Sequence, residues 1–416
     1  MRRGGAALAF VAFLALSAPA PAPADAKSES EAAALRALVE RLRAPLEELR
    51  GLAFTSALAT EQVDRQTARR HIERLLAADY PPALLAAEQE AYRYFGLIGA
   101  EDDLEALLLD LLESQVAGFY DPGEKRLFVV PGPMAGSLAL VHELAHALED
   151  QHFDLEGLAD AARGDDDRTL ALSGLIEGSA TMVSFLWGIR ASMDPSLPPI
   201  VEGDTAELMK AAAAGLDDVP AFIKESLLFP YTAGAVWAST VMKRGGGLKA
   251  LDGWFAEPPG STEQILHPER SVEQRDLPSV IAPGALPRLS VEEGLLVKMN
   301  TMGEFGIRGL LATSDSAGAE KAAEGWDADL YIISRRGEAR ELSWLSYWDS
   351  AGDAAEFEQA LRAWLAGRAS SSGSPWSVRA EGRVVAAAEG GVGKGASPED
   401  RVAVMMARAA EEIRAR

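Results

Sequence analysis

The chain contains no cysteine among its 416 residues, which excludes a disulfide and a lipid-modified amino-terminal cysteine. Its stability must therefore come from core packing, with a bound metal ion as one further source. Cationic side chains are also few, 40 against 63 acidic ones, so the formal net charge is −23. This excess of negative charge argues against nucleic acids and anionic membrane surfaces as partners.

Histidine is scarce as well, with five residues in the chain, yet His142, His146 and His152 lie close together. On an α-helix four residues advance by about 400°, so His142 and His146 project from one face and can bind a single Zn2+. Glu143 is offset by about 100° and can reach water at that metal without being a ligand. The spacing predicts two ligands and a general base, the H-E-x-x-H pattern of zinc metallopeptidases.

A structural explanation of the same residues also exists. A five-residue pattern with only three fixed residues also occurs by chance. An amphipathic helix with two core histidines has the same sequence pattern. Ser137 is a suitable N-cap for this helix, which is predicted to run to about Gln151. The concentration of so few histidines in one segment favours a metal site.

The beginning of the chain has the composition of a secretory signal peptide. Arg2 and Arg3 precede an apolar run at 6–16, and Ala24-Asp25-Ala26 offers a cleavage site, with Ala18-Pro19-Ala20 as an earlier alternative. The apolar run is shorter than the ~17–25 residues that span a bilayer, which argues against a membrane anchor. We expect cleavage after Ala26, a secreted or periplasmic location and no stable membrane insertion afterwards.

Hydrophobic periodicity predicts a predominantly helical α+β protein divided at about 26, 117 and 278. After the signal peptide (1–26), residues 27–117 are expected to be a helical scaffold or a removable propeptide, with helices at 28–50, 60–78, 84–94 and 102–114. Residues 118–278 are predicted to form the catalytic core. Residues 279–416 are predicted to form a small α+β unit without an evident catalytic set, in which 370–374 is a loop.

A β-hairpin is predicted directly before the histidine helix. Asp121-Pro122-Gly123 is a turn signal between two β-prone runs. The second run, Leu127–Val130, is expected either to pair with an extended substrate or to be purely structural.

A second long helix, predicted over 168–190, has a single charged residue between Leu170 and Trp187, namely Glu177. Its Ser, Thr and Gly content argues for a buried helix and against a bilayer span. A buried carboxylate is costly unless a cation or hydrogen bonds satisfy it, and a zinc ion would do so. Gly174 and Gly178 remove side chains where another helix could approach closely.

The remaining core is expected to contain a loop around 157–167 and further helices at 206–214, 219–228 and 232–243. Phe229-Pro230-Tyr231 is predicted to separate the last two of these helices. Ser261 to Gln264 has the pattern of a capping box at a helix start.

The segment His142 to His146 followed by Glu177-Gly178-Ser179-Ala180 resembles the gluzincin metallopeptidases, in which a glutamate on the next major helix is the third zinc ligand. The resemblance covers about 45 residues. It implies a zincin-like core, Zn2+ held by His142, His146 and Glu177, and Glu143 as the base in peptide hydrolysis. Segments 118–122 and 261–268 are similar to uncharacterised secreted bacterial proteins of this type.

One departure concerns the residue four positions after Glu177. Thermolysin-like members have an aspartate there that orients a histidine, whereas this chain has Thr181. The groups that surround the ligands must therefore be built differently.

His152 is a rival third ligand, because it follows His146 at the spacing of the metzincin pattern. That pattern needs a glycine where this chain has Glu149. A helix that continues would carry His152 about 9 Å along the axis beyond His146, so Glu177 is favoured.

The resemblance also implies a downstream Tyr or His that stabilises the oxyanion of the reaction. Tyr231 and His267 are the candidates, and a packing role is the alternative for each. The expected partner is a peptide or protein substrate. A degenerate zincin that binds zinc or peptide without turnover is the alternative, and the presence of Glu143 argues against it. A metal-free helical envelope protein is a further alternative.

Overall fold

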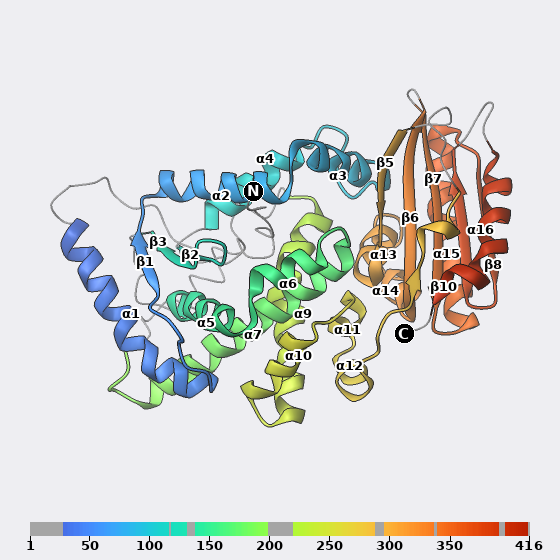
Figure 1. Ribbon diagram of the computed structural model, residues 1–416. Coiled ribbons are helices and arrows are strands. Elements are labelled where there is room, and N and C mark those ends of the chain that lie inside the picture. Colours follow the sequence, from blue (N-terminus) through green and yellow to red (C-terminus); the bar gives the residue numbers. More distant parts are fainter. Residues whose placement is uncertain are drawn as a thin grey trace. The chain divides into compact units, whose positions relative to one another are not determined.

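The computed structural model describes residues 28–115, 118–130, 138–198, 219–287, 295–336, 339–390 and 396–414. It is a mixed α+β protein in which helices predominate, as the sequence predicts (Figure 1). The predicted signal peptide, Ser137 and the expected helix at 206–214 lie outside the described residues, so these remain predictions.

The described residues group into two compact units. The first comprises 28–85, 102–163 and 172–258, and the second comprises 86–101, 164–171 and the part that begins at 259. Both units are therefore assembled from three separate stretches of sequence. The predicted division at 117 and 278 does not follow these boundaries and remains a prediction.

The first unit contains most of the helices and one small sheet. In chain order its elements are α1 (Ser28–Arg50), β1 (Ala59–Gln62), α2 (Arg65–Asp79), the start of α3 (Pro82–Phe95), α4 (Leu104–Gln115), β2 (Gly118–Asp121), β3 (Arg126–Val129), α5 (Leu138–Phe153), α6 (Leu155–Ala162), α7 (Asp166–Met193, from Leu172 on), α9 (Ala221–Gly245), the 3-10 turn η1 (Leu248–Leu251) and α10 (Asp252–Ala256).

The predicted hairpin is confirmed, but it belongs to a three-stranded sheet of order β1-β3-β2. β1 pairs in parallel with β3, and it occupies residues that the sequence assigned to the start of a helix. That helix begins only at Arg65, where Asp64 caps it by accepting a hydrogen bond from the amide of Thr67. Since β3 has a strand on each side, the suggestion that Leu127–Val130 pairs with substrate is wrong.

Two helices differ from expectation. Residues 155–162 form α6 rather than a loop, because the side chain of Asp154 accepts a hydrogen bond from the Gly157 amide and caps a helix start. Pro230 does not break the chain into two helices but lies inside the continuous α9. The packing of α9 within the unit outweighs the cost of about 3 kcal/mol that proline has in a helix interior.

α7 is long and apolar enough to cross a membrane by length and composition, but 72% of its most apolar window is buried inside the protein. The expected close approach of another helix is confirmed. A Cβ on Gly178 would lie 2.3 Å from the carbonyl oxygen of Gly234 on α9, and one on Gly234 would lie 2.4 Å from that of Gly174. The backbones of α7 and α9 therefore touch at these three glycines.

The second unit is built on a five-stranded sheet of order β5-β6-β7-β9-β8, in which each neighbouring pair is antiparallel. Its elements are the rest of α3, the start of α7, α11 (Thr262–Leu266), α12 (Pro268–Gln274), β4 (Val280–Ile281), η2 (Pro283–Ala285), β5 (Leu295–Asn300), α13 (Gly303–Ala312), α14 (Ala319–Ala323), β6 (Trp326–Arg336), β7 (Ala339–Trp348), α15 (Ala351–Ser372), β8 (Trp376–Glu381), β9 (Val384–Glu389), α16 (Pro398–Glu412) and β10 (Ile413–Arg414).

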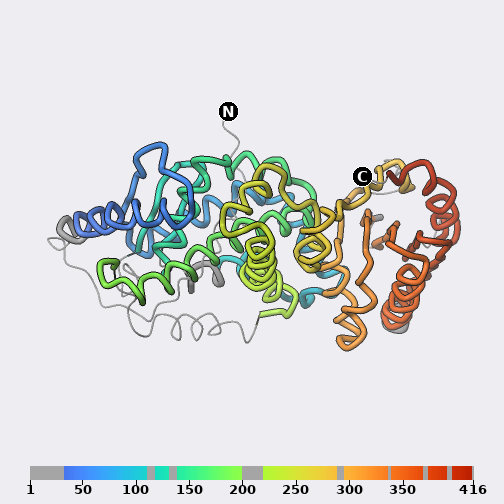
Figure 2. The backbone as a smooth tube through the Cα atoms, turned by 90° about the horizontal axis from the view of Figure 1, so that it is seen from below, coloured from blue at the N-terminus to red at the C-terminus, as the bar shows by residue number. Residues whose placement is uncertain are grey.

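Alternate residues of this sheet face two different sets of helices. Val402 and Met405 of α16 pack with Leu330 and Ile332 on one face. On the other face, Phe357 of α15 packs edge-on against Trp344. Figure 2 shows the orange strands with α15 and α16 beside them.

Two local predictions in the second unit are wrong. α15 continues to Ser372, so much of the expected loop at 370–374 is helical. The capping box at Ser261 does not form, since its side chain makes no cap hydrogen bond. Instead, Asp167 accepts hydrogen bonds from the backbone amide and the hydroxyl of Thr262. The Asp167 carboxylate thus pairs with a backbone amide that has no partner inside the helix at the start of α11.

Candidate metal centre

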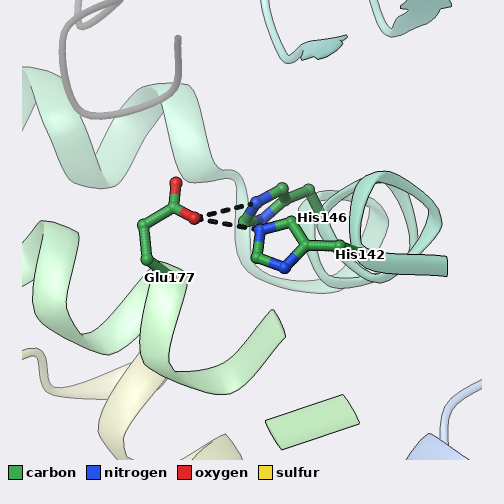
Figure 3. Close-up of side chains that lie close together, drawn as sticks. All are labelled: His142, His146 and Glu177. Atoms are coloured by element: carbon green, nitrogen blue, oxygen red, sulfur yellow. Dashed lines mark hydrogen bonds and ion pairs between the residues drawn. The ribbon is translucent and has the colours of Figure 1, made fainter. Parts of the chain in front are cut away.

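His142 and His146 lie on one face of α5 and meet Glu177 of α7, as the sequence predicts (Figure 3). One carboxylate oxygen, Oε2 of Glu177, is 3.0 Å from Nε2 of His142 and 3.4 Å from Nε2 of His146. All three side chains are buried, with at most 3% of each exposed. Two nitrogens and one carboxylate oxygen thus converge in a site that could hold a metal ion.

The charges in this cluster are strongly coupled. Burial, and after it the neighbouring His146, lower the pKa of His142 to about 4, although Glu177 acts to raise it. Burial also acts to lower the pKa of His146, but the Glu177 carboxylate outweighs it and the pKa rises to about 9. Burial acts to raise the pKa of Glu177, yet the two histidines bring it down to about 2. A proton on His146 therefore balances the charge of Glu177, and a metal cation could take over that role.

Glu143 lies beside the ligands, and the structure places it against the hairpin. Its Oε2 accepts a hydrogen bond of 2.7 Å from the backbone amide of Tyr120 on β2. Burial is the main reason that its pKa rises to about 8, and Glu177 contributes to the rise. His146 and the Tyr120 amide act in the opposite direction.

The donor set suits a divalent metal ion. Within the described part of the chain, no hydrogen-bond partner reaches the buried Oε1 atoms of Glu143 and Glu177 or Nδ1 of His146. Buried polar atoms without partners are costly, and a bound cation with its own water would satisfy the two carboxylates. Two imidazoles and one carboxylate are also a ligand set that zinc uses in catalytic sites.

Tyr231 is also at this site. Its ring centroid is 6.3 Å from that of His142. Burial is the main cause that raises the pKa of its hydroxyl, and the charges of Glu177 and Glu143 add to the effect. Tyr231 stands one turn before Gly234, the point at which α9 touches α7.

Near the ligands, Glu149 of α5 links the two helices that carry them and also forms a buried ion pair with α1. Glu149, one turn after His146, accepts a hydrogen bond of 2.5 Å from the hydroxyl of Ser179 on α7. The same oxygen pairs at 2.7 Å with Arg50, the last residue of α1, and both side chains are fully buried. Arg50 also pairs with Asp252 at 2.7 Å. α1 is therefore part of the packing around the metal centre, which favours the scaffold interpretation over a removable propeptide.

The two rival histidines lie elsewhere. His152 is exposed, and its Nε2 donates to the carbonyl oxygen of Ala53 at 2.8 Å, because α5 continues to Phe153 instead of turning back. His267 belongs to the second unit, where its Nε2 donates to Glu304 at 2.8 Å. Neither is among the residues that converge on Glu177.

A second group of possible ligands consists of His71, Asp121 and Glu124. Arg74 donates to Nδ1 of His71 at 2.5 Å, so Nε2 carries the proton and donates to Asp121 at 2.7 Å. With both ring nitrogens engaged and a guanidinium beside them, this group is explained as a hydrogen-bonded support of the hairpin.

Sequence reasoning missed the residues that surround the ligands, chiefly Arg50, Tyr120, Glu149 and Asp150. One signal is present in the sequence, since the charged pair Glu149 and Asp150 continues the helix that carries the histidines. In the structure both lie in a run of twelve consecutive buried positions of α5. Charged residues that continue a ligand-bearing helix need partners from other elements, but the sequence does not say which elements supply them.

Comparison with known proteins gives one match. A family described as "Domain of unknown function (DUF8575)" matches residues 293–414, less than a third of the chain. The match covers none of the metal-centre residues. No curated protein and no solved structure matches the chain.

Proposed function

We propose that the protein is a zinc-dependent metallopeptidase of the gluzincin type. The observation that carries the proposal is the buried convergence of His142, His146 and Glu177 with Glu143 beside them. A site that only stabilised the fold would need a further ligand and no base, whereas three ligands and a neighbouring carboxylate are the arrangement of catalytic zinc sites.

In this proposal His142, His146 and Glu177 would hold the ion. Zinc supplies Lewis acidity, which polarises a peptide carbonyl and makes water acidic enough to attack near neutral pH. Glu143 accepts the proton of the attacking water and returns it to the leaving amine. A nearby cation would lower the raised pKa of Glu143 and keep it ionised for this task. The Tyr231 hydroxyl is proposed to donate to the developing oxyanion.

The test is zinc content and peptide hydrolysis of four proteins. Wild type and Glu143→Gln are expected to bind one zinc ion each, while Glu143→Gln loses hydrolysis by about 10²-fold or more. Glu177→Ala is expected to lose zinc. His152→Ala is the matched control, a histidine of the same helix whose loss should leave zinc in place.

The outcomes separate the candidate functions. Stoichiometric zinc without turnover in wild type would support the degenerate zincin that binds without catalysis. No zinc in wild type would refute the metallopeptidase. If zinc were lost only in His152→Ala, the third ligand would be His152 and not Glu177. A secreted or periplasmic location and a peptide or protein substrate belong to the same proposal.

A further inference from the structure

Tyr120 of the hairpin β2–β3 makes two hydrogen bonds to the metal helix that the proposed chemistry does not use. Its backbone amide donates to Oε2 of Glu143 and its hydroxyl donates to Oδ2 of Asp150, each at 2.7 Å. Glu143 and Asp150 are seven residues apart, about two helical turns, so the tyrosine lies along one side of α5.

The amide contact places the outer edge of β2 against the metal helix. Tyr120 pairs in register with Leu127 of β3, but its amide is directed at Glu143 and not at the partner strand. Of the two Glu143 oxygens, this amide engages Oε2 and leaves Oε1 for other contacts. A single backbone N–H thus fixes the rotation of the carboxylate.

The hydroxyl contact ends on a carboxylate that several groups hold in place. The Asp150 side chain is fully buried, and Lys125 of the hairpin turn contacts its two oxygens at 3.0 and 2.8 Å. The amide of Leu155 donates to the same carboxylate at 3.0 Å. Asp150 therefore receives donors from the strand, from the turn and from the start of α6.

The other side of the hairpin is anchored separately. Asp121, next to Tyr120, accepts from His71 of α2 at 2.7 Å and from the amides of Gly123 and Glu124 at 2.8 and 2.9 Å. The strand that carries the Tyr120 amide is therefore held on both flanks, and its distance from α5 is set by the Asp150 contact.

We propose that Tyr120 is a positioning residue for Glu143. Its hydroxyl, anchored by Asp150 and Lys125, holds β2 at the distance from α5 at which its amide orients the Glu143 carboxylate. This inference rests on the proposed function, because it treats Glu143 as the base. A purely structural role would lower stability without changing the turnover of the folded enzyme.

The kinetic test uses Tyr120→Phe in the zinc-loaded full chain with an internally quenched peptide selected on wild type. The backbone amide stays, but the ring loses its anchor, so we expect kcat to fall about 10- to 100-fold, since small misplacements of a catalytic group have effects of this size. KM should stay within about twofold and zinc should remain bound, because the ligands are untouched.

The matched control is Tyr94→Phe, in the second unit. It removes another buried tyrosine-to-carboxylate hydrogen bond, the 2.5 Å contact of Tyr94 with Glu389, and should leave kcat unchanged. Asp150→Asn keeps an acceptor for the hydroxyl and should retain much more activity than Asp150→Ala. Equal kcat in Tyr120→Phe and Tyr94→Phe would refute the positioning role.

A second measurement does not depend on turnover. Labelling the seven tyrosines with ¹⁵N gives few amide signals, and Tyr120→Phe identifies the one from Tyr120. We expect this signal to shift and its hydrogen exchange to accelerate in Glu143→Ala and in Asp150→Ala, but not in Tyr94→Phe. An unchanged Tyr120 signal in both alanine variants would overturn the inference. If wild type bound zinc but hydrolysed nothing, the proposed function would fail while this measurement still decided whether Tyr120 holds Glu143.

Discussion

At the scale of single residues, one hydroxyl distinguishes the two explanations of Tyr231. If it stabilises the oxyanion, Tyr231→Phe should lower kcat by about 10²-fold, the usual effect of removing one such donor. Zinc content and thermal stability should change little, because the ring that packs near His142 remains. Full activity in Tyr231→Phe would assign the residue to packing alone.

Glu263 in the second unit gives a prediction about pH. Burial, then the charges of Glu304, Asp276 and Asp349, raise its pKa to about 10, although Arg270 acts to lower it. Because the pKa of Glu263 in the folded protein is above its ordinary value of 4.5, the protonated carboxyl favours the folded state. The contribution of Glu263 to stability is therefore fully present below about pH 4.5 and is lost as the pH rises towards 10.

Glu263→Gln should therefore stabilise the protein at about pH 7, by on the order of 2 kcal/mol, since a neutral amide avoids the proton uptake that folding requires there. Urea midpoints at about pH 5, 7 and 9 should also become more alike than in wild type. The exposed Glu320→Gln is the control and should change stability by less than about 0.5 kcal/mol. A variant less stable than wild type at neutral pH would contradict the prediction.

At the scale of helices and strands, the three glycines between α7 and α9 hold the site together. A methyl group at Gly178 would meet the Gly234 backbone at 2.3 Å and push the helices apart. Overpacking of this kind costs about 1–3 kcal/mol. Gly178→Ala should lower the melting temperature and weaken zinc binding, because it moves Tyr231 and strains the helix that carries Glu177.

Gly253→Ala is the control for this substitution, since a methyl group there has no atom within 4 Å. We expect it to be neutral or slightly stabilising, as alanine favours a helix over glycine by about 1 kcal/mol. If Gly178→Ala had the same melting temperature as Gly253→Ala and kept its zinc, the close contact between the helices would have no energetic consequence.

The same elements indicate what could be predicted from sequence. The convergence of His142 and His146 was predictable, because helical spacing puts both histidines on one face. That Glu177 joins them is what the resemblance to gluzincins implies, and a lone buried carboxylate that needs a cation agrees with it. The helix α1 was predicted with its observed ends, since its apolar positions recur at helical spacing. β1 was missed because a four-residue edge strand has little periodicity of its own.

The contacts of Glu149 and Asp150 could not be predicted, because their partners come from α1, α7, β2 and the hairpin turn. Such pairings depend on which elements meet in space, and hydrophobic periodicity carries no information on that. Pro230 was misjudged for a similar reason. Local preference disfavours proline inside a helix, and packing of α9 against α7 overrides it.

At the scale of the whole molecule, the second unit needs residues from the first quarter of the chain. Phe95 of α3 is buried and lies 5.2 Å from Tyr331 and 6.3 Å from Trp344, ring centre to ring centre. Lys298 of β5 is buried and paired with Glu88 of α3. The fragment 259–416 should therefore be loosely packed on its own and bind a dye that reports exposed apolar surface.

A synthetic peptide of residues 86–101 should bind this fragment and reduce its dye binding. The same peptide with Phe95→Ala should bind at least about tenfold more weakly, since removing a buried phenylalanine commonly costs about 3–5 kcal/mol. Tight packing of the fragment without any peptide would show that the unit does not need α3.

The interleaving of the two units also has a consequence for the order in which the chain is made. Residues 86–101 leave the ribosome long before β6, β7 and β9, the strands that later receive them. Since domains whose sequence is contiguous can fold as synthesis proceeds, this chain differs from the usual case. The side chains of Tyr94 and Phe95 stay without all of their packing partners until nearly three hundred further residues have been added. The nascent chain should therefore depend on holding chaperones to an extent that neither unit would if its sequence were continuous.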